Sequence, residues 1–229
     1  GIGLYGLASL LLFERMPDYL LRHLVRFGFT WTSMLSAKFL ITVTFLFVPT
    51  LLFGAACTAA GRAVREFLPS SGRTAGEVSM FNTLGSALGA ALGGFLLLPL
   101  LGMQSSLVAL YCLALILAAA VAAAILRSHG SRLAWVTGAV AVMVLSAMAL
   151  PRWDPHLLAA GPYFSPWNFV RDGRVFLREH MSSERLLFFH EGVTSTISVA
   201  RTAEEKLYFS SNGKVEADTG PRSMVLQRM

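Results

Sequence analysis

Acidic residues are scarce in this chain, and the scarcity is concentrated in residues 1–150. Only 14% of the 229 residues are charged, whereas soluble domains carry about 25%. Four of the 13 acidic residues precede residue 151, namely Glu14, Asp18, Glu66 and Glu77. Together with a hydrophobic content of 55%, this composition argues against an ordinary soluble fold over that part. The change in polarity near residue 150 predicts two domains.

The chain also lacks the spacings that mark metal sites, disulfide frameworks and hydrolase triads. Cys57 and Cys112 lie far apart in apolar stretches, so we expect them to serve as small hydrophobic residues in a helix bundle. His156, His180 and His190 follow no H-x-x-H or H-E-x-x-H spacing, and no Gly-x-Ser-x-Gly elbow occurs. We therefore predict neither a metal site nor a serine hydrolase.

Basic residues outnumber acidic ones, and most of the excess lies in the apolar part. The formal net charge is +6, of which +5 belongs to residues 1–150. There the arginines stand mainly in short loops between apolar stretches, where they commonly meet lipid headgroups. We therefore expect a lipid bilayer as a partner and no nucleic acid.

Four apolar stretches are long enough to cross a bilayer, which takes about 20 helical residues. They cover residues 39–60, 80–101, 106–126 and 133–150. Residues 1–13 are apolar but shorter, which predicts the end of a helix that belongs to a longer protein. We therefore expect residues 1–150 to form a transmembrane helical region of about four full spans plus a partial N-terminal one.

The polar and charged residues within 1–150 do not determine how the spans are oriented in the membrane. Residues 14–26 mix charged and apolar side chains, as in a loop or an interfacial amphipathic helix. No acidic residue lies within a predicted span, which argues against ion-coupled transport by these spans alone. The loops carry similar numbers of Lys and Arg, so the side of the membrane that the C-terminal part faces stays open.

Three glycines mark one face of the second span. Gly85, Gly89 and Gly93 form two overlapping G-x-x-x-G steps, and residues four apart share a helix face where another backbone can approach closely. We expect this face to pack against another helix of the bundle. A dimer interface or a transport path is the alternative.

The pattern changes after Pro151. Short segments rich in β-branched and aromatic residues cover 174–178, 185–189, 194–199 and 207–209, which predicts strands. Asn212 and Gly213 tolerate positive φ and mark a tight hairpin turn. We expect residues 151–220 to form a small antiparallel β domain of four or five strands, and residues 221–229 to begin a following, truncated domain.

Two segments of this C-terminal part resemble a known family. Phe189–Val199 reads FHEGVTSTISV and Leu207–Glu216 reads LYFSSNGKVE, and together they resemble the N-terminal β domain of spermidine synthases. Pro49–Ala55 and Asn82–Gly89 are similar to the membrane region of bacterial proteins that join several helices to a spermidine-synthase-like module. The resemblance implies a membrane α-helical bundle followed by a small antiparallel β domain of the spermidine synthase N-terminal kind, in the bacterial inner (plasma) membrane.

The resemblance also implies a chemistry. In that family an amine attacks the propyl carbon of decarboxylated S-adenosylmethionine, which yields a longer polyamine and methylthioadenosine. Asn212 stands where the family has Asp, and Gly213 matches its Gly. Glu216 takes the place of a Gln that lines the substrate cleft, Asp218 follows two residues on, and Gln227 replaces a Glu. Glu216, Asp218 and Gln227 are thus the candidates for binding a cationic, polyamine-like substrate.

Other parts of the family pattern are missing from this chain. Pro221-Arg222 stands in place of an Asp-Glu pair, and Val225-Leu226 in place of a Tyr-His pair. The glycine-rich nucleoside-binding segment and the catalytic aspartate are expected only beyond Met229. We therefore assign no catalytic residue and no cofactor to this fragment, and we expect it to be inactive alone.

Three functions remain open at this point. The first is a membrane-anchored, spermidine-synthase-like transferase, truncated before its catalytic domain and in contact with a second copy as a homodimer. The alternative is a transporter-like membrane protein with a non-catalytic synthase-like β module. A purely structural membrane anchor is the third.

Overall fold

The computed structural model describes residues 1–65, 71–125 and 130–220, and its contacts divide the chain into two compact units. The helical unit comprises Gly1–Leu11 and Val43–Pro151, and the sheet unit comprises Leu12–Thr42 and the chain from Arg152 onward. The sequence places the division near residue 150. The structure differs in grouping Leu12–Thr42 with the sheet, because this segment contributes buried side chains to the core there.

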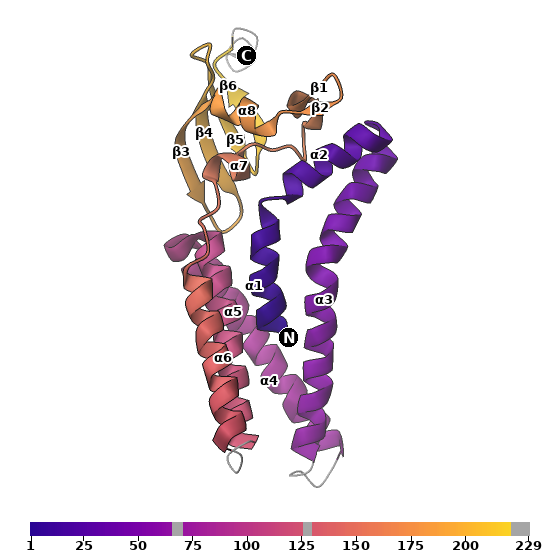
Figure 1. The fold of residues 1–229 in the computed structure, drawn as a ribbon, viewed down its shortest axis with the longest axis vertical. Coiled ribbons are helices and arrows are strands. Elements are labelled where there is room, and N and C mark those ends of the chain that lie inside the picture. The colour runs from indigo at the N-terminus through magenta and orange to yellow at the C-terminus, as the bar shows by residue number, and fades with distance from the viewer. Residues whose placement is uncertain (66–70, 126–129, 221–229) are drawn as a thin grey trace. The chain divides into compact units, whose positions relative to one another are not determined.

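Most of the chain before residue 150 is helical (Figure 1). The helices, including one π-helical turn, are α1 (Ile2–Phe13), α2 (Met16–Phe27), α3 (Trp31–Arg65), α4 (Ser71–Leu92), η1 (Gly93–Leu97), α5 (Leu98–Ile125) and α6 (Gly130–Met148).

Backbone geometry separates α4 from the main part of α5. Gly102 has φ 76° and ψ 172°, outside the helical region, and this break lies between the two spans predicted at residues 80–101 and 106–126. Gln104 donates from Nε2 to the carbonyl of Pro151 at 2.7 Å, while only four residues separate the other end of α5 from α6. The two helices therefore run antiparallel (Figure 1).

Close backbone contact within the helical unit occurs at α1. A Cβ placed on Gly6 would lie 2.2 Å from the ring of Tyr111, and one on Gly3 would lie 2.6 Å from the side chain of Leu115. The hydroxyl of Tyr5 donates to the carbonyl of Thr44 in α3. These glycines let α1 approach α5 more closely than any larger residue would.

The glycine face of α4 behaves differently. A Cβ at Gly85, Gly89 or Gly93 would meet nothing within 4 Å in the part of the chain that the structure describes. No described residue covers this face, and its packing against another helix stays a prediction. The glycine spacing gives a helix an open face, but what fills that face depends on the neighbouring helices.

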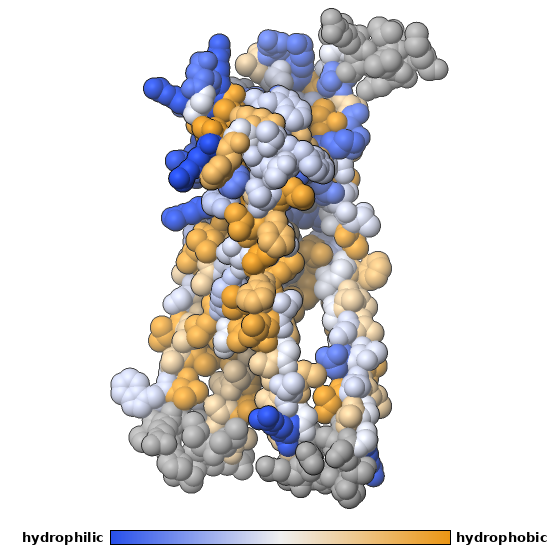
Figure 2. Space-filling model, turned by 90° about the vertical axis from the view of Figure 1, so that its right-hand side faces the viewer, coloured by the Kyte–Doolittle hydropathy of each residue, from blue (hydrophilic) through white to orange (hydrophobic). Residues whose placement is uncertain are grey.

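Two stretches in the described residues are long and apolar enough to cross a membrane, Trp31–Ala63 and Ala75–Ala124. Of the 18 most apolar consecutive residues, 0% are buried in the first stretch and 6% in the second. The core helix of a soluble protein is, by contrast, mostly buried. Figure 2 shows many hydrophobic residues over the helical part of the face that it draws. The described apolar part of α6, Ala134–Met148, is shorter.

The second stretch begins before the span predicted from residue 80, and its added part contains one acidic residue. Helix α4 begins at Ser71, well before residue 80, and therefore includes Glu77. The carboxylate of Glu77 accepts a hydrogen bond from Arg73 Nε at 3.0 Å. An i, i+4 pair of this kind neutralises both charges near the end of the helix.

The sheet unit holds the remaining elements (Figure 1). They are α7 (Pro155–Ala159), the 3₁₀ turn η2 (Pro166–Phe169), β1 (Val170–Arg171), β2 (Arg174–Val175), α8 (Leu177–Ser182), β3 (Arg185–Glu191), β4 (Thr196–Arg201), β5 (Leu207–Ser211) and β6 (Lys214–Asp218). Strands β3 to β6 form one antiparallel sheet in sequence order, and β1 pairs with β2. The prediction of a small antiparallel sheet is confirmed.

The strand predicted over 174–178 is wrong after Val175. Leu177–Ser182 forms α8 instead. Leu177 and Met181 are 4% and 7% exposed, and residues four apart lie on one face of a helix. Burial of this pair in the core favours the helix over the short strand that the local composition suggests.

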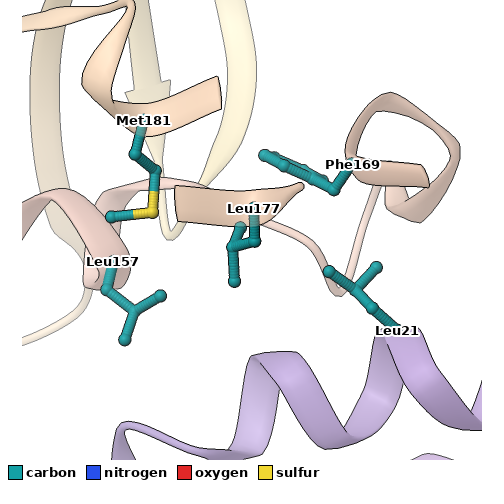
Figure 3. Packing of buried hydrophobic residues seen from close by; sticks show 5 residues of the cluster. All are labelled: Leu21, Leu157, Phe169, Leu177 and Met181. Carbon is teal, nitrogen blue, oxygen red and sulfur yellow. The ribbon is translucent and has the colours of Figure 1, made fainter. Parts of the chain in front are cut away.

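Helix α2 supplies much of the core of the sheet unit. Leu20, Leu21 and Leu24 are at most 1% exposed, and each such burial contributes about 1.5–3 kcal/mol. One cluster joins Leu21 to four residues of the C-terminal part, as Figure 3 shows; they are Leu157, Phe169, Leu177 and Met181. Of the two interpretations of residues 14–26, a loop or an amphipathic helix, the structure shows the helix. The apolar face of this helix packs against protein.

Candidate functional site

A pocket with a volume of about 960 Å³ lies in the sheet unit beside the hairpin formed by β5 and β6. Its aromatic walls come from Phe164, Trp167, Phe169 and Tyr208. Its ionisable side chains come from α8, from the residues before β3 and from the β5–β6 hairpin; they are His180, Glu184, Lys206, Lys214 and Asp218.

The predicted turn forms one edge of this pocket. Asn212 and Gly213 have φ values of 51° and 78°, as expected for a two-residue hairpin turn with two positive φ angles. The Asn212 side-chain oxygen accepts a hydrogen bond from the backbone N–H of Thr196 at 2.9 Å, and its own backbone N–H donates to the Thr196 carbonyl at 2.8 Å. Asn212 thus ties the turn to the start of β4.

A β-bulge decides which residues of β6 line the pocket. Ser210 pairs with Val215 and Phe209 pairs with Ala217, which leaves Glu216 as the extra residue. In a regular strand residues 216 and 218 would lie on one face, but a bulge interrupts that alternation. Accordingly Val215 and Asp218 line the pocket, whereas Glu216 does not.

The structure therefore separates the two predicted acidic residues. Glu216 is exposed and accepts from Lys214 Nζ at 3.1 Å. Asp218 is partly buried, and its Oδ1 accepts from the backbone N–H of Gly220 at 2.6 Å. Gln227, the third predicted substrate residue, lies outside the described residues.

Glu184 is a pocket residue that the sequence analysis did not select. The Tyr208 hydroxyl donates to its Oε2, and His180 Nε2 lies 3.4 Å from its Oε1. The Glu184 side chain is 18% exposed. The sequence shows the i, i+4 spacing of His180 and Glu184. It does not show that Tyr208 in β5 donates a hydrogen bond to Glu184.

Burial changes the acid–base properties of the pocket. Desolvation is the main cause that raises the pKa of Tyr208 above its usual value of 10.0, and the adjacent Glu184 raises it further. Ion pairing with Glu204 at 2.5 Å raises the pKa of Lys206 and lowers that of Glu204, and the charge of Asp218 also raises the Lys206 pKa. Tyr208 thus stays a hydrogen-bond donor at neutral pH.

The pocket combines carboxylates and aromatic faces, which can bind an organic cation, with the side chains of Lys206 and Lys214. Carboxylates form strong charge-assisted hydrogen bonds with amines, and exposed aromatic faces attract ammonium groups. Trp167 and Phe164 in the wall are 62% and 47% exposed. Across the described ranges no group of three or more His, Cys, Asp or Glu side chains could hold a metal ion.

Comparisons with protein-family models, with curated proteins and with solved structures found no match to this chain.

Proposed function

We propose that this chain is the membrane-anchoring and amine-binding part of a spermidine-synthase-like transferase. The transferase moves an aminopropyl group from decarboxylated S-adenosylmethionine to a polyamine. The amine nitrogen forms a bond to the propyl carbon, the carbon–sulfur bond breaks, methylthioadenosine leaves and the amine loses a proton. The nucleoside-binding and catalytic groups of that family are not assigned to any residue of this chain.

One observation carries the amine-binding part of this proposal. Asp218, a candidate from the family resemblance, shares a pocket with the aromatic side chains of Trp167 and Phe164 and with the carboxylate of Glu184. Oriented negative charge beside aromatic faces is the environment that a protonated amine requires. The partly buried carboxylates also lie where water screens them less than at an open surface.

The membrane part rests on the helical unit. Its long apolar helices leave their most apolar windows almost entirely unburied, and lipid is the solvent in which such side chains are stable. The chain is then an integral membrane protein, which we place in the bacterial inner membrane. Contact with a second copy as a homodimer stays a prediction.

Amine binding can be tested on the full-length protein by calorimetric titration with putrescine and spermidine. Asp218→Asn is expected to weaken binding about tenfold, which corresponds to about 1.4 kcal/mol for loss of a charge-assisted hydrogen bond. Glu216→Gln, which removes the same charge outside the pocket, serves as the matched control and should leave the affinity within about twofold. Equal effects of both variants would refute the assignment of the pocket.

The transfer step has a separate readout. Full-length protein supplied with an amine and decarboxylated S-adenosylmethionine should release methylthioadenosine, measured chromatographically. Amine binding without any methylthioadenosine would refute the transferase and leave only the binding function.

A second candidate is a transporter-like membrane protein with a non-catalytic synthase-like module. The observation that favours it is the pairing of Glu184. One oxygen of this carboxylate accepts a hydrogen bond from Tyr208, and the other lies against His180. A carboxylate engaged in this way contributes to the structure of the pocket more than to capture of an amine. Amine uptake into vesicles, together with absence of transfer activity, would support this candidate.

A further inference from the structure

The turn between α2 and α3 carries three exposed aromatic side chains within five residues. Phe27 ends α2, Phe29 lies in the connection and Trp31 begins α3. These residues are 58%, 49% and 78% exposed. Gly28 between the two phenylalanines has φ 87°, which permits the sharp change of chain direction. We call residues 26–31 the aromatic corner.

The backbone of the aromatic corner is held in place. The hydroxyl of Ser33 donates to the carbonyl of Phe27 at 3.2 Å, and the backbone N–H of Ser33 donates to the hydroxyl of Thr30 at 3.2 Å. On the adjoining part of α2, His23 Nε2 lies 3.1 Å from the hydroxyl of Ser36 in α3. The aromatic side chains thus project from a fixed turn.

A cation accompanies these aromatic side chains. The guanidinium of Arg26 lies 5.4 Å from the centroid of the Phe27 ring. Arg22, one turn earlier, is paired with Asp18 at 2.6 Å, but no carboxylate of the described residues pairs with Arg26. The corner therefore offers an exposed positive charge next to exposed apolar rings.

The core of the sheet unit does not account for this exposure. The apolar face of α2 is already used, because Leu20, Leu21 and Leu24 are buried within that core. Phe27 and Phe29 lie outside both core clusters. The rings of the aromatic corner are therefore available for contact outside the core of the sheet unit.

The position of Trp31 along α3 indicates what that partner is. Trp31–Ala63 is a continuous apolar stretch of 33 residues, and at about 1.5 Å per residue its first residue lies about 24 Å from its middle. The hydrocarbon region of a bilayer ends about 15 Å from the midplane, and the headgroup region ends about 20–22 Å from it. An untilted helix would leave Trp31 about 2 Å beyond the headgroup region. A tilt of about 25–30° shortens its distance from the midplane to about 21 Å, so a tilted α3 centred on the bilayer places Trp31 at headgroup depth.

We propose that the aromatic corner binds anionic phospholipid headgroups at the surface of the bilayer. Phe27, Phe29 and Trp31 occupy the interface that aromatic side chains prefer, and Arg26 pairs with the negative charge of the lipid. The inference rests on the membrane part of the proposed function and is independent of amine binding.

The first experiment measures the depth of Trp31. The full-length chain and its Trp31→Phe variant are reconstituted in phosphatidylcholine vesicles that carry a nitroxide either on the headgroup or near the end of the acyl chain. The difference between the two proteins isolates the Trp31 signal. We expect the headgroup label to quench this signal at least about twofold more than the deep label. Equal quenching, or none, would overturn the proposal.

The second experiment measures lipid preference. Headgroup-labelled phosphatidylglycerol should compete for the corner about fivefold better than labelled phosphatidylcholine, as expected for about 1 kcal/mol per basic residue at the surface. Arg26→Gln should bring this ratio close to one, whereas Arg174→Gln, which removes an equal charge from β2, should leave it unchanged. A wild-type ratio of one, or the same loss in both variants, would contradict the role of Arg26.

Alkaline carbonate extraction distinguishes membrane anchoring of the chain from lipid binding by the aromatic corner. Retention of the chain in the membrane with an unquenched Trp31 would refute the lipid site alone. Release of the chain by carbonate would refute both membrane anchoring and the lipid site, and would leave the amine-binding proposal to its own test.

Discussion

Gly161 and Gly213 lie backbone against backbone in the sheet unit, although 52 residues separate them in the sequence. A Cβ built on Gly161 would lie 1.7 Å from the carbonyl oxygen of Gly213, and one built on Gly213 would lie 2.5 Å from the Cα of Gly161. Both residues have positive φ, 65° and 78°. The predicted turn is thus also a tertiary contact, which brings the segment after α7 against the hairpin.

We therefore expect Gly161→Ala to destabilise the sheet unit by about 3 kcal/mol or more, since strain at positive φ adds to a clash with backbone. Gly173→Ala is the matched control. Gly173 has φ 70°, and its Cβ would meet nothing within 4 Å among the residues that the structure describes. That variant should lose only about 1–2 kcal/mol from backbone strain. Urea unfolding followed by circular dichroism distinguishes the two, and similar losses would refute the contact.

The hydrogen bonds of Asn212 predict an asymmetry between two substitutions. Asn212→Asp keeps an oxygen acceptor for the Thr196 N–H and a side chain that tolerates positive φ, so stability should change by less than about 0.5 kcal/mol. Asn212→Ala removes the acceptor and retains the positive φ, which should cost about 2 kcal/mol. Thermal unfolding measures both. An Ala variant as stable as the Asp variant would show that the side chain does not hold the turn.

Burial of α2 predicts a large loss of stability on substitution within a segment that is rich in charged residues. Leu21 is 0% exposed and packs with Phe169 and Leu177, so Leu21→Ala should cost about 2–5 kcal/mol. Tyr19, two residues earlier on the same helix, is 45% exposed, and Tyr19→Ala should cost less than about 1 kcal/mol. Denaturant midpoints of the detergent-solubilised chain provide the comparison. Equal losses would mean that α2 does not belong to this core.

Two tyrosines of the sheet unit should lose their hydroxyl protons at a higher pH than a free tyrosine. Burial raises the pKa of Tyr163 to about 12, and burial with Glu184 raises that of Tyr208. Because both folded-state values lie above the unfolded value of 10.0, their contribution to stability is complete below pH 10 and is lost as the pH rises through the folded pKa. Tyrosinate absorbance against pH measures this.

Substitutions show which tyrosine gives rise to each ionisation at high pH. Tyr208→Phe should remove one of them. Glu184→Gln should lower the pKa of Tyr208 only in part, because burial is the larger cause. A Tyr208 that titrates normally in the wild-type protein would contradict its burial against Glu184.

Some features followed directly from local sequence. The turn at Asn212-Gly213 and the break at Gly102 form at residues whose side chains or lack of them permit positive φ, and this property needs no tertiary partner. The antiparallel order of β3 to β6 follows from the short connections between them, because a hairpin is the arrangement that such connections allow. The apolar helices likewise reflect the composition of their own residues.

The candidate site was less predictable. Asp218 lines the pocket and Glu216 does not, because a bulge interrupts the alternation of β6. The glycine face of α4 is open in the described residues, while Gly3 and Gly6 in the short helix α1 form the close helix contact. In each case the local pattern allows an approach, and the choice of partner depends on elements far away in the chain.

The sequence by itself determined an apolar helical part, a polar antiparallel sheet and the turn between its last strands, since these depend on hydrophobicity and on backbone preferences of neighbouring residues. Only the tertiary structure decided that α2 belongs to the sheet unit, that Glu184 and Tyr208 meet Asp218 in one pocket, and that Gly161 presses against Gly213. Such contacts form between residues distant in sequence, and they are selected by the free energy of burying side chains together in three dimensions, which no local pattern records.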